Sequence, residues 1–588
     1  MRQTGGFELF LIRGFPMPDS GAPSGSRQPG ASSGARAAWV DERLNQQMPV
    51  SISKLTPLTF LERNAVVFAD KTAVIYEGRH YSYGELRRRV HRLAGALRKA
   101  GIRPGDRVAY LAPNLPVLLE AHFGVPLAGA ILVAINIRLS SAEIAYILDH
   151  SEAKLLVVDA ELGSLVEPLA ARLEFTKKFV IARDSASDSA GEPQQELTLQ
   201  GEDYEDFLTG GEDQFEDLRL EDENDVISVN YTSGTTGRPK GVMYTHRGAY
   251  LNALGVGGLM GLNNSSNYLW VVPMFHCNGW SCTWGVTAMG ATHVCLRKAE
   301  PEKMLQVIER DRVTNFCCAP TVLSSLLNHP SARNFRLDHP LRVCLGGAPP
   351  SPALIRDGEK IGIDVAHIYG LTETYGPFTV CEWRQLWSGK ELVEQAQIKA
   401  QQGVTHALSG AGLRVVDDQM RDVPADSSTL GEVVMRGNIV MKGYFKDPQA
   451  TEAAFRGGWF HSGDLAVVHP SGYIEIRDRK KDIIISGGEN ISTQEVEKAI
   501  SEHPDVMEVA VVAVPHEKWG EVPKAFVTLK PGRHISERDI IEFCRQRMPH
   551  FKCPHAVVFG PLPKTSTGKV KKFAIREIEW AGYDKRVH

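Results

Sequence analysis

Strand-like and helix-like segments alternate along the first part of this chain. Apolar runs at residues 107–111 and 130–134 are typical of buried strands, and the spacing of apolar residues predicts helices over 82–99 and 115–125. Such alternation predicts an α/β fold with parallel strand pairs, because each helix returns the chain to the same edge of the sheet. A chain of 588 residues is too long for one ordinary hydrophobic core, so we expect several subdomains.

The pattern changes in the second half of the chain. Residues 382–402 are charged and predict an exposed helical insertion, and short glycine-punctuated pieces over 431–476 predict a small β subdomain. Beyond a charged run at 477–482 an αβ pattern returns, with a capping box at Ser492–Glu495 that predicts a helix start. We therefore predict a boundary at the charged run, which divides the chain into residues 46–478, a hinge at 479–482 and a C-terminal domain at 483–588.

Charge and composition exclude several classes of protein. A formal net charge of −4 gives no footprint for nucleic acid, and the longest apolar region, 123–137, is interrupted by Pro126 and is too short to span a bilayer. The nine cysteines include no regular CxxC pair, so we expect reduced thiols in a cytoplasmic protein, without a disulfide framework or zinc site. Residues 1–45, rich in Gly, Ser, Pro and Arg, are either a disordered extension upstream of a start at Met48 or a mitochondrial transit peptide.

The stretch Tyr231–Val242 has the composition of a phosphate-binding loop. The residues before it predict a strand, and Gly241–Tyr244 predicts the returning strand. A glycine-rich loop that leaves a strand can present backbone N–H groups to phosphate oxygens, and its hydroxyls and Lys240 add donors and positive charge. The spacing is not that of a Walker A motif, because Pro239 intervenes. Taken alone, the stretch is as compatible with a flexible surface loop.

Four further segments place polar side chains in loops or turns. The segment Tyr369–Thr374 supplies two hydroxyls and a carboxylate, and Mg²⁺ beside a triphosphate binds one or two carboxylates. The segment His461–Asp464 places an acid after a glycine turn, which suits a ribose diol. Asp478–Arg479 lies at the predicted domain boundary, and Pro563–Lys569 is a second loop rich in Gly, Thr and Lys. Each alone has an ordinary explanation, such as a polar loop, a turn aspartate, an exposed ion pair or a solvated lysine.

Together these segments resemble the adenylate-forming superfamily of acyl-CoA synthetases, luciferases and peptide-synthetase adenylation domains. The resemblance covers about residues 50–578 and rests on five motifs in fixed order, which are Tyr231–Val242, Tyr369–Thr374, His461–Leu465, Asp478–Asp482 and Pro563–Lys569. Within that superfamily, residues 276–280, 284–285, 382–383 and 486–492 look like the plant-type acyl-activating enzymes and their microbial relatives. The implied fold is a large N-terminal domain of two α/β subdomains plus a small β subdomain, with a mobile C-terminal α+β domain.

The resemblance implies an AMP-forming acyl-CoA synthetase that uses ATP, Mg²⁺ and coenzyme A. A carboxylic acid would attack the α-phosphate of ATP, and the CoA thiol would then displace AMP. Thr372 would contact the α-phosphate, Glu373 would bind Mg²⁺, and Lys569 would bridge the acid and the α-phosphate. The other nucleotide-binding residues implied are Thr232, Ser233, Gly234, Thr235, Thr236, Gly237 and Lys240 for the β- and γ-phosphates, Gly346, Gly347, Ala348, Pro349, Tyr369 and Gly370 for adenine, and Asp464 and Arg479 for ribose.

The same resemblance implies an acyl pocket and a CoA tunnel. His276, Trp280 and Trp284 would line the acyl pocket, and two indoles on one short segment would shorten it, which favours a short- or medium-chain acid. Rotation of the C-terminal domain about Lys481 would replace Lys569 by a CoA-binding loop that contains Ser486, Gly487, Gly488, Glu489 and Asn490.

Several alternatives stay open from the sequence. The acid could be aromatic or methylthiopropionate, the acyl acceptor could be a carrier protein, and a non-catalytic nucleotide sensor would share the fold. A sensor would be expected to have lost Glu373, Asp464 or Lys569, and all three are present. The oligomeric state is also open.

Overall fold

The computed structural model describes residues 53–184, 199–215, 220–232, 239–410, 412–564 and 570–583, apart from the side chain of Asn334. The described residues from Lys54 onward form one compact unit. The predicted extension at 1–45, half of the predicted phosphate loop (233–238) and Lys569 lie outside the described residues.

A mostly parallel sheet, with eight strands among the described residues, contains the strand predicted before the phosphate loop. Its strands pair in parallel from β7 to β8, and β9 and β19 then extend it antiparallel. In spatial order the strands are β19 (Gly443–Tyr444), β9 (Lys240–Thr245), β8 (Val226–Thr232), β4 (Ile131–Ala134), β3 (Arg107–Leu111), β5 (Ala153–Asp159), β6 (Lys178–Ala182) and β7 (Glu202–Asp203).

The helices of this region bury apolar faces against one another. Ser82 begins α3 through a complete capping box with Glu85, which satisfies backbone donors of the first turn. In α4 almost every residue is buried, so its apolar residues do not keep to one face. The helices are α2 (Leu58–Val67), α3 (Tyr83–Lys99), α4 (Pro116–Leu127), α5 (Ser141–Ser151), α6 (Gly163–Val166), α7 (Tyr204–Thr209) and α8 (His246–Leu259).

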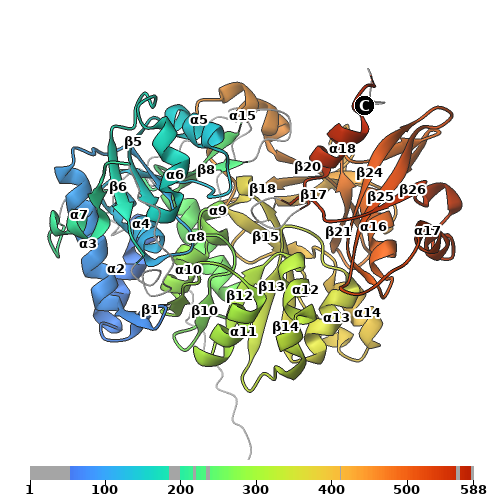
Figure 1. The fold of residues 1–588 in the computed structure, drawn as a ribbon, viewed down its shortest axis with the longest axis horizontal. Coiled ribbons are helices and arrows are strands. Elements are labelled where there is room, and N and C mark those ends of the chain that lie inside the picture. The colour runs from blue at the N-terminus through green and yellow to red at the C-terminus, as the bar shows by residue number, and fades with distance from the viewer. Residues whose placement is uncertain are drawn as a thin grey trace, which may run out of the picture. The chain divides into compact units, whose positions relative to one another are not determined.

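A second large sheet, with nine strands in the described ranges, carries parallel strands at its centre and antiparallel strands at both ends. Helices α11, α12 and α13 lie side by side across β12–β14 (Figure 1). The strands in order are β16 (Val404–Thr405), β15 (Gly376–Val380), β14 (Ile363–Leu371), β13 (Leu341–Leu345), β12 (Asn315–Cys318), β10 (Asn267–Leu269), β11 (Thr292–Val294), β1 (Thr72–Tyr76) and β2 (Arg79–Ser82), and the helices are α9 (Cys277–Trp280), α10 (Cys282–Ala288), α11 (Pro301–Arg310), α12 (Pro320–Asn328) and α13 (Pro352–Lys360).

The predicted small β subdomain is a four-stranded antiparallel sheet over the described residues, and it begins earlier than expected, at Gly412. Its strand order is β17 (Gly412–Val416), β18 (Gly431–Arg436), β20 (Phe460–Val468) and β21 (Ile474–Arg479), and α15 (Pro448–Ala454) lies between β18 and β20 in the chain. The last strand, β21, leads directly into the predicted hinge.

Residues after the hinge build a separate sheet with its own apolar core, which includes Ile484, Val496 and Val511. Long antiparallel strands at its centre are flanked by a parallel edge strand and by helices. The elements are β22 (Ile484–Ser486), β23 (Glu489–Ile491), α16 (Thr493–Ser501), β24 (Val506–His516), β25 (Gly520–Leu529), α17 (Glu537–Arg545), β26 (Ala556–Phe559) and α18 (Lys572–Glu579).

The predicted α/β fold is confirmed, with one local correction. The segment 382–402 is not an exposed helix throughout, since only α14 (Leu392–Lys399) is α-helical. Trp387 is buried, and its ring meets Tyr473 edge-on with centroids 5.2 Å apart. The indole therefore anchors a segment whose charge suggested a solvated surface.

Two further observations concern the cysteines and the helices. All nine cysteines are free and buried, in agreement with the predicted reduced thiols. None of the helices in the described ranges combines the length and apolar composition needed to cross a membrane.

Candidate active site

The antiparallel hairpin β14–β15 carries the segment Tyr369–Thr374. Its register shifts between Tyr369 and Gly370. A Cβ atom on Gly370 would lie 1.8 Å from the carbonyl oxygen of Gly376, so only glycine fits at this bulge. Glycine at the bulge therefore lets the backbones of Gly370 and Gly376 approach closely. This approach places Thr372 and Glu373 at the end of the hairpin.

The predicted ribose-binding residues form a connected group. Asp464 on β20 lies opposite Arg479 on β21, and the Arg479 Nε is 3.0 Å from Asp464 Oδ1. The Tyr369 hydroxyl donates to the other carboxylate oxygen at 2.7 Å. Asp464 raises the pKa of Arg479, and its carboxyl group is held by groups from two sheets before any ligand arrives.

Glu373 is a half-buried carboxylate with a specific hydrogen-bond donor. Burial raises its pKa above the ordinary value, and the Tyr444 hydroxyl on β19, which donates to Oε1 at 2.8 Å, opposes that rise. A divalent cation beside this side chain would offset the cost of burying its charge. In the described residues no group of three or more His, Cys, Asp and Glu side chains gathers as for a protein-only metal site. A carboxylate of this kind therefore suits Mg²⁺ that takes its other ligands from phosphate and water.

Thr372 is held on two sides. The Tyr244 hydroxyl donates to its carbonyl oxygen at 2.6 Å, and the Cys277 thiol donates to its Oγ1 at 3.4 Å. Burial raises the pKa of Cys277 to about 12, so the sulfur keeps its proton. The Tyr244 ring stacks on Tyr375 with centroids 3.9 Å apart, which fixes the donor of the first bond.

The base of the predicted phosphate loop lies beside Glu373. Strands β8 and β9 form the predicted hairpin, with Thr232 paired to Lys240. The Lys240 Nζ lies 4.8 Å from the ring centre of Tyr444, whose hydroxyl binds Glu373. One aromatic ring therefore connects the predicted phosphate lysine to the predicted metal ligand. The predicted residues Ser233, Gly234, Thr235, Thr236 and Gly237 lie outside the described residues.

Residues 277–281 form a turn of left-handed helix, in which every φ is positive. Four of the five residues are not glycine, and a left-handed helical conformation costs such residues roughly 1–2 kcal/mol each. The turn is buried and tied to β8, because Asn278 Oδ1 accepts from Ser228 Oγ at 2.7 Å and from Asn230 Nδ2 at 2.6 Å. Strain that the surrounding structure maintains is typical of functional sites.

A small cavity of about 50 Å³ joins the left-handed turn to the hairpin. The turn at Gly346–Gly347 follows the carboxyl end of β13, where open α/β sheets commonly bind ligands. The cavity brings together seven residues that the sequence analysis predicted, which are His276, Trp280, Gly346, Gly347, Tyr369, Gly370 and Thr372, and it adds Cys277, Ile368, Leu371, Gly376 and Pro377.

Other predicted residues of this region lie outside the cavity wall. Ala348 and Pro349 continue the turn after Gly347. Trp284 is fully buried, and its Nε1 donates to the carbonyl oxygen of His122 at 3.1 Å. Its role in the acyl pocket stays a prediction, whereas Trp280 meets the cavity directly.

The predicted CoA loop, Ser486–Asn490, is the tight connection between β22 and β23. The Gly487 backbone N–H donates to the carbonyl oxygen of Trp519 at 2.8 Å, and a Cβ on Gly487 would lie 2.8 Å from the Trp519 ring. Gly487 and Gly488 both have positive φ, at 59° and 90°. Glycine is therefore required at Gly487 by conformation and by space.

The predicted hinge contacts both of its neighbours. The Lys480 backbone N–H donates to the carbonyl oxygen of Gly463 at 2.9 Å, on the side of the small β subdomain. On the other side, Asp478 accepts from Thr493 Oγ1 at 2.8 Å, and Asp482 pairs with Arg576. The Lys481 side chain is exposed among these contacts. Lys569 lies outside the described residues.

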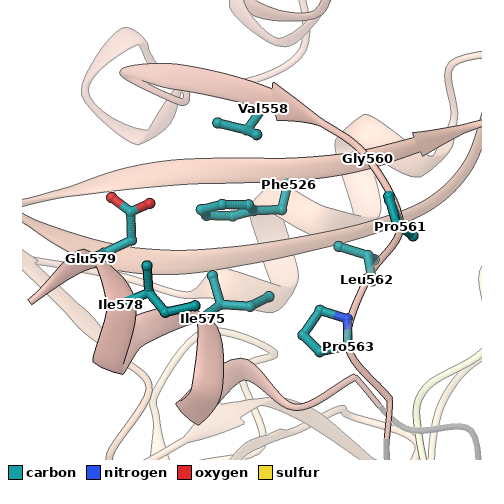
Figure 2. A pocket seen from close by; sticks show the side chains of 9 residues that line it. All are labelled: Phe526, Val558, Gly560, Pro561, Leu562, Pro563, Ile575, Ile578 and Glu579. Atoms are coloured by element: carbon teal, nitrogen blue, oxygen red, sulfur yellow. The ribbon is translucent and has the colours of Figure 1, made fainter.

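A larger hollow of about 180 Å³ lies on the C-terminal sheet (Figure 2). Figure 2 shows the Phe526 ring between Val558 and Ile575, with the carboxylate of Glu579 at one end. Glu579 pairs with Lys524 at 2.8 Å. None of the nine lining residues is a predicted site residue, although Pro563 begins the loop that leads to Lys569 in the sequence.

The sequence analysis missed several side chains at the site. Tyr444, Tyr244 and Cys277 hold Glu373 or Thr372, and Asn278 ties the left-handed turn to β8. Tyr444 is 71 residues from Glu373 in the chain, so no local spacing links them. The sequence offered one signal, the glycine-punctuated region around Gly443–Tyr444. The structure pairs these two residues with β9, the strand after the phosphate loop.

Comparisons with known proteins find relatives along most of the chain. A family model described as AMP-binding enzyme matches residues 61–445, and one described as AMP-binding enzyme C-terminal domain matches 495–569. The chain is 48% identical to an acetate–CoA ligase of Humulus lupulus and 44% identical to a 4-hydroxybutyrate–CoA ligase of Metallosphaera sedula; each match covers 89% of this chain and 94% of the relative. The crystal structure of an anthranilate CoA ligase in complex with anthranoyl-AMP is similar with a TM-score of 0.80 and 26% identity, over 90% of this chain and 97% of the other.

Proposed function

Because this chain belongs to the AMP-binding enzyme family, we propose that it is an AMP-forming acyl-CoA synthetase for a short- or medium-chain carboxylic acid. The observation that carries the proposal is the group formed by Tyr369, Asp464 and Arg479 next to the hairpin that bears Thr372 and Glu373. It provides a preformed site for the ribose of a nucleotide beside a carboxylate suited to Mg²⁺.

The proposed first half-reaction joins the acid to AMP. An oxygen of the acid's carboxylate forms a bond to the α-phosphorus of ATP, and the bond to the bridging oxygen of pyrophosphate breaks. The protein contributes positioning and charge neutralisation. We assign the α-phosphate to Thr372 and Lys569, the β- and γ-phosphates to the 232–240 loop, and ribose to Asp464 and Arg479.

The adenine would lie against the turn 346–349, with the Tyr369 ring stacked on it. The bond from the Tyr369 hydroxyl to Asp464 would link the base and ribose sites. Mg²⁺ held by Glu373 would neutralise part of the phosphate charge. Tyr444 would then orient the Glu373 carboxylate while Lys240, stacked on the same ring, faces the phosphates.

The proposed second half-reaction transfers the acyl group to CoA. The thiol sulfur loses its proton and bonds to the acyl carbon, and the bond from that carbon to the AMP oxygen breaks. We propose that the domain after residue 482 rotates about Lys481 between the two steps, so that Ser486–Asn490 lines the pantetheine path. The double glycine of that loop supports close approach of a thin ligand.

The proposed size of the acid follows from Trp280. Its buried indole closes a cavity of about 50 Å³, which leaves little room for a long chain. The relatives named for acetate and 4-hydroxybutyrate favour the same size, whereas the anthranilate CoA ligase keeps an aromatic acid as an alternative. Methylthiopropionate and a carrier-protein acceptor also stay as alternatives.

The deciding experiment is a pyrophosphate-release assay on the purified full chain with MgATP. The acids are acetate to laurate, branched acids, benzoate and methylthiopropionate, each with and without CoA. Acid-dependent release that is sustained only with CoA is expected. A single burst regardless of CoA would point to another acceptor, and no release with any acid would contradict the proposed function.

Lys569→Ala tests the assigned role of the C-terminal lysine. We expect at least a hundredfold loss of acyl-AMP formation, because opposite charge must be present when a carboxylate approaches a phosphate. Chemically prepared acyl-AMP should still be converted to acyl-CoA. Normal adenylation by this variant would refute the role, and Lys564→Ala, in the same segment, is the matched control.

We propose a cytoplasmic location, with a mitochondrial one as the alternative if residues 1–45 act as a transit peptide. Fluorescence microscopy of the full chain and of a chain starting at Met48, each with a C-terminal tag, separates the two. Analytical ultracentrifugation of the same proteins would determine the oligomeric state.

A further inference from the structure

The left-handed turn at 277–281 requires something to hold it. Positive φ is uncommon outside glycine, and asparagine is one of the few residues that adopt it readily, whereas cysteine, tryptophan and serine do not. Within the turn, the Gly279 backbone N–H donates to the His276 carbonyl oxygen at 2.8 Å and the Ser281 N–H to that of Cys277 at a longer 3.3 Å. These two bonds do not favour the left-handed form over a right-handed turn, so the cause lies in tertiary contacts.

Asn278 supplies the tie to the sheet. Its Oδ1 accepts from Ser228 and Asn230, both on β8, and its backbone N–H donates to Asn230 Oδ1 at 3.1 Å. Because the Asn230 Oδ1 accepts this N–H, the orientation of the Asn230 amide is fixed. Its Nδ2 then needs an acceptor, which Asn278 Oδ1 provides. All three side chains are at most 1% exposed, so water cannot replace these bonds.

Trp280 is the residue that the turn delivers to the cavity. A Cβ on Gly346 would lie 3.0 Å from the indole, and a Cβ on Gly376 would lie 2.9 Å from the Trp280 Cα. The indole thus packs on the Gly346 backbone and the Trp280 backbone packs on Gly376, so the residue cannot move further inward. Relaxation of the turn can only carry it away from Gly346, which lengthens the cavity.

We propose that Asn278 is a positioning residue for acid selectivity. By tying the left-handed turn to β8, it holds the Trp280 indole against Gly346 and Gly347, and the indole in that place limits the length of the acid. This inference rests on the proposed function. Asn278 itself bonds to β8. The same turn carries Cys277, which donates to Thr372, so the selectivity between acids is the readout that separates the acid pocket from the ATP site.

The fold does not depend on this tie alone. The Ser281 hydroxyl donates to the carbonyl oxygen of Tyr375 at 3.1 Å, and Asn252 Nδ2 donates to Ser281 Oγ at 2.9 Å. The C-terminal end of the turn therefore stays attached when Asn278 is changed. A variant at 278 is expected to fold with a turn that is free to relax near Trp280.

The test compares Asn278→Ala and Asn278→Gly with the wild type across straight-chain acids from acetate to octanoate. We expect kcat/KM for the longest accepted acid, divided by that for the shortest, to rise at least about tenfold, as for a hydrophobic pocket that gains room for one methylene or more. A change in the KM for MgATP would act on all the acids alike, so the ratio between two acids is independent of it. Glycine lacks the Cβ penalty at positive φ, so a smaller shift is expected for it than for alanine.

Two controls separate positioning from general damage. Asn315→Ala removes a buried bond to the Met260 carbonyl oxygen, at 2.9 Å and away from the turn, and should leave selectivity unchanged. The double variant with Trp280→Ala should have the selectivity of Trp280→Ala alone, because Asn278 acts through that indole.

Each outcome decides the matter. An active wild type with unchanged selectivity in the Asn278 variants would overturn the inference and leave the proposed function intact, and so would an equal shift in Asn315→Ala. A wild type that releases no pyrophosphate with any acid would overturn both. If the Asn278 variants do not fold, Ser228→Ala, which removes one of the two donors, carries the same comparison with the same expected direction.

Discussion

Three tyrosine hydroxyls set the positions of the groups that would meet the nucleotide. Tyr369 donates to Asp464, Tyr444 to Glu373, and Tyr244 to the carbonyl oxygen of Thr372. Each comes from a different strand and reaches across to another element. A hydroxyl of this kind can be removed by a change to phenylalanine, which keeps the ring and deletes one bond.

Tyr369→Phe should weaken nucleotide binding selectively. The ring that stacks on adenine remains, but Asp464 loses one of its two fixed partners and becomes less well oriented for ribose. We expect the KM for ATP to rise on the order of tenfold, since hydrogen bonds to charged groups contribute about 1.5–3 kcal/mol. The KM for the acid should not change, and initial-rate kinetics measures both.

Tyr473→Phe is the matched control, because its hydroxyl donates to the Glu382 carbonyl oxygen at the same distance of 2.7 Å, outside the site. Equal effects of the two changes on the KM for ATP would contradict the assigned role of Tyr369.

Tyr444→Phe should move the pH dependence of metal binding. Burial raises the pKa of Glu373, and only the ionised form binds Mg²⁺, so the apparent Mg²⁺ affinity is expected to fall as the pH drops through that raised pKa. The Tyr444 bond stabilises the carboxylate and lowers the pKa. Its loss should therefore move the midpoint to higher pH. The Mg²⁺ concentration for half-maximal adenylation, measured against pH, checks this.

Glu373→Gln supplies the reference for that experiment, because its weakened Mg²⁺ dependence should no longer vary with pH in the same range. Superimposable midpoints for the wild type and Tyr444→Phe would show that the hydroxyl does not tune Glu373.

At the scale of elements, backbone conformations that only some residues can adopt place the side chains. The bulge at Gly370 in hairpin β14–β15 lies against the Gly376 carbonyl oxygen. Gly376 in turn lies against Trp280 of the left-handed turn at 277–281. The hairpin is paired within itself. The turn depends on bonds to β8, a distant part of the chain.

Gly370→Ala should disrupt the hairpin. The new methyl would overlap the Gly376 carbonyl, so the strands must separate and Thr372 and Glu373 move. Overpacking of this kind costs about 1–3 kcal/mol or more, and we expect at least a hundredfold loss of adenylation with a lower unfolding temperature. Gly389→Ala is the control, since nothing lies within 4 Å of its added Cβ and stability and rate should be unchanged. An active Gly370→Ala enzyme would show that the bulge is dispensable.

These two elements also mark how far sequence reasoning reaches. The helix at 83–99 and the strand at 107–111 were predictable because apolar periodicity and the Ser82 capping box report on local structure. The motifs predicted Tyr369, Asp464 and Arg479, which lie together. The positive φ of Cys277, Trp280 and Ser281 was not predictable, because it contradicts the preference of those residues and is imposed by β8 and β15. The Tyr444–Glu373 contact joins β19 of one sheet to the turn that follows β14 of another, which only the tertiary fold reveals.

At the scale of the whole molecule, the residues proposed to bind ribose and the joint between the two predicted domains share one strand. Arg479 ends β21 and holds Asp464, and Asp478, immediately before it, binds Thr493 of the C-terminal part. A rotation about the joint therefore has to break the Asp478–Thr493 contact or move Asp478 with it, one residue away from the proposed ribose site. This arrangement would couple nucleotide occupancy to the position of the C-terminal domain.

Lys481→Pro tests whether the joint must turn. Proline fixes φ near −65° and removes one backbone donor, so residues 480–482 lose most of their freedom. We expect acyl-AMP formation at nearly the wild-type rate but at least a tenfold loss of acyl-CoA formation, measured separately by pyrophosphate exchange and thioester appearance. Lys481→Ala removes the same exposed side chain without restricting the backbone and should retain both activities. A normal overall rate for the proline variant would rule out a hinge at this residue.

The Cys277 thiol beside Thr372 has a chemical consequence for an enzyme that forms an activated acyl group. An acyl-adenylate reacts readily with thiolates, and a cysteine in the cavity wall is a competitor of the incoming thiol at very high effective concentration. With its pKa raised to about 12, fewer than about one Cys277 in ten thousand is ionised near neutral pH. The same burial that lets the sulfur orient Thr372 thus protects the protein from acylating itself, and the intermediate survives until a solvent-borne thiol arrives.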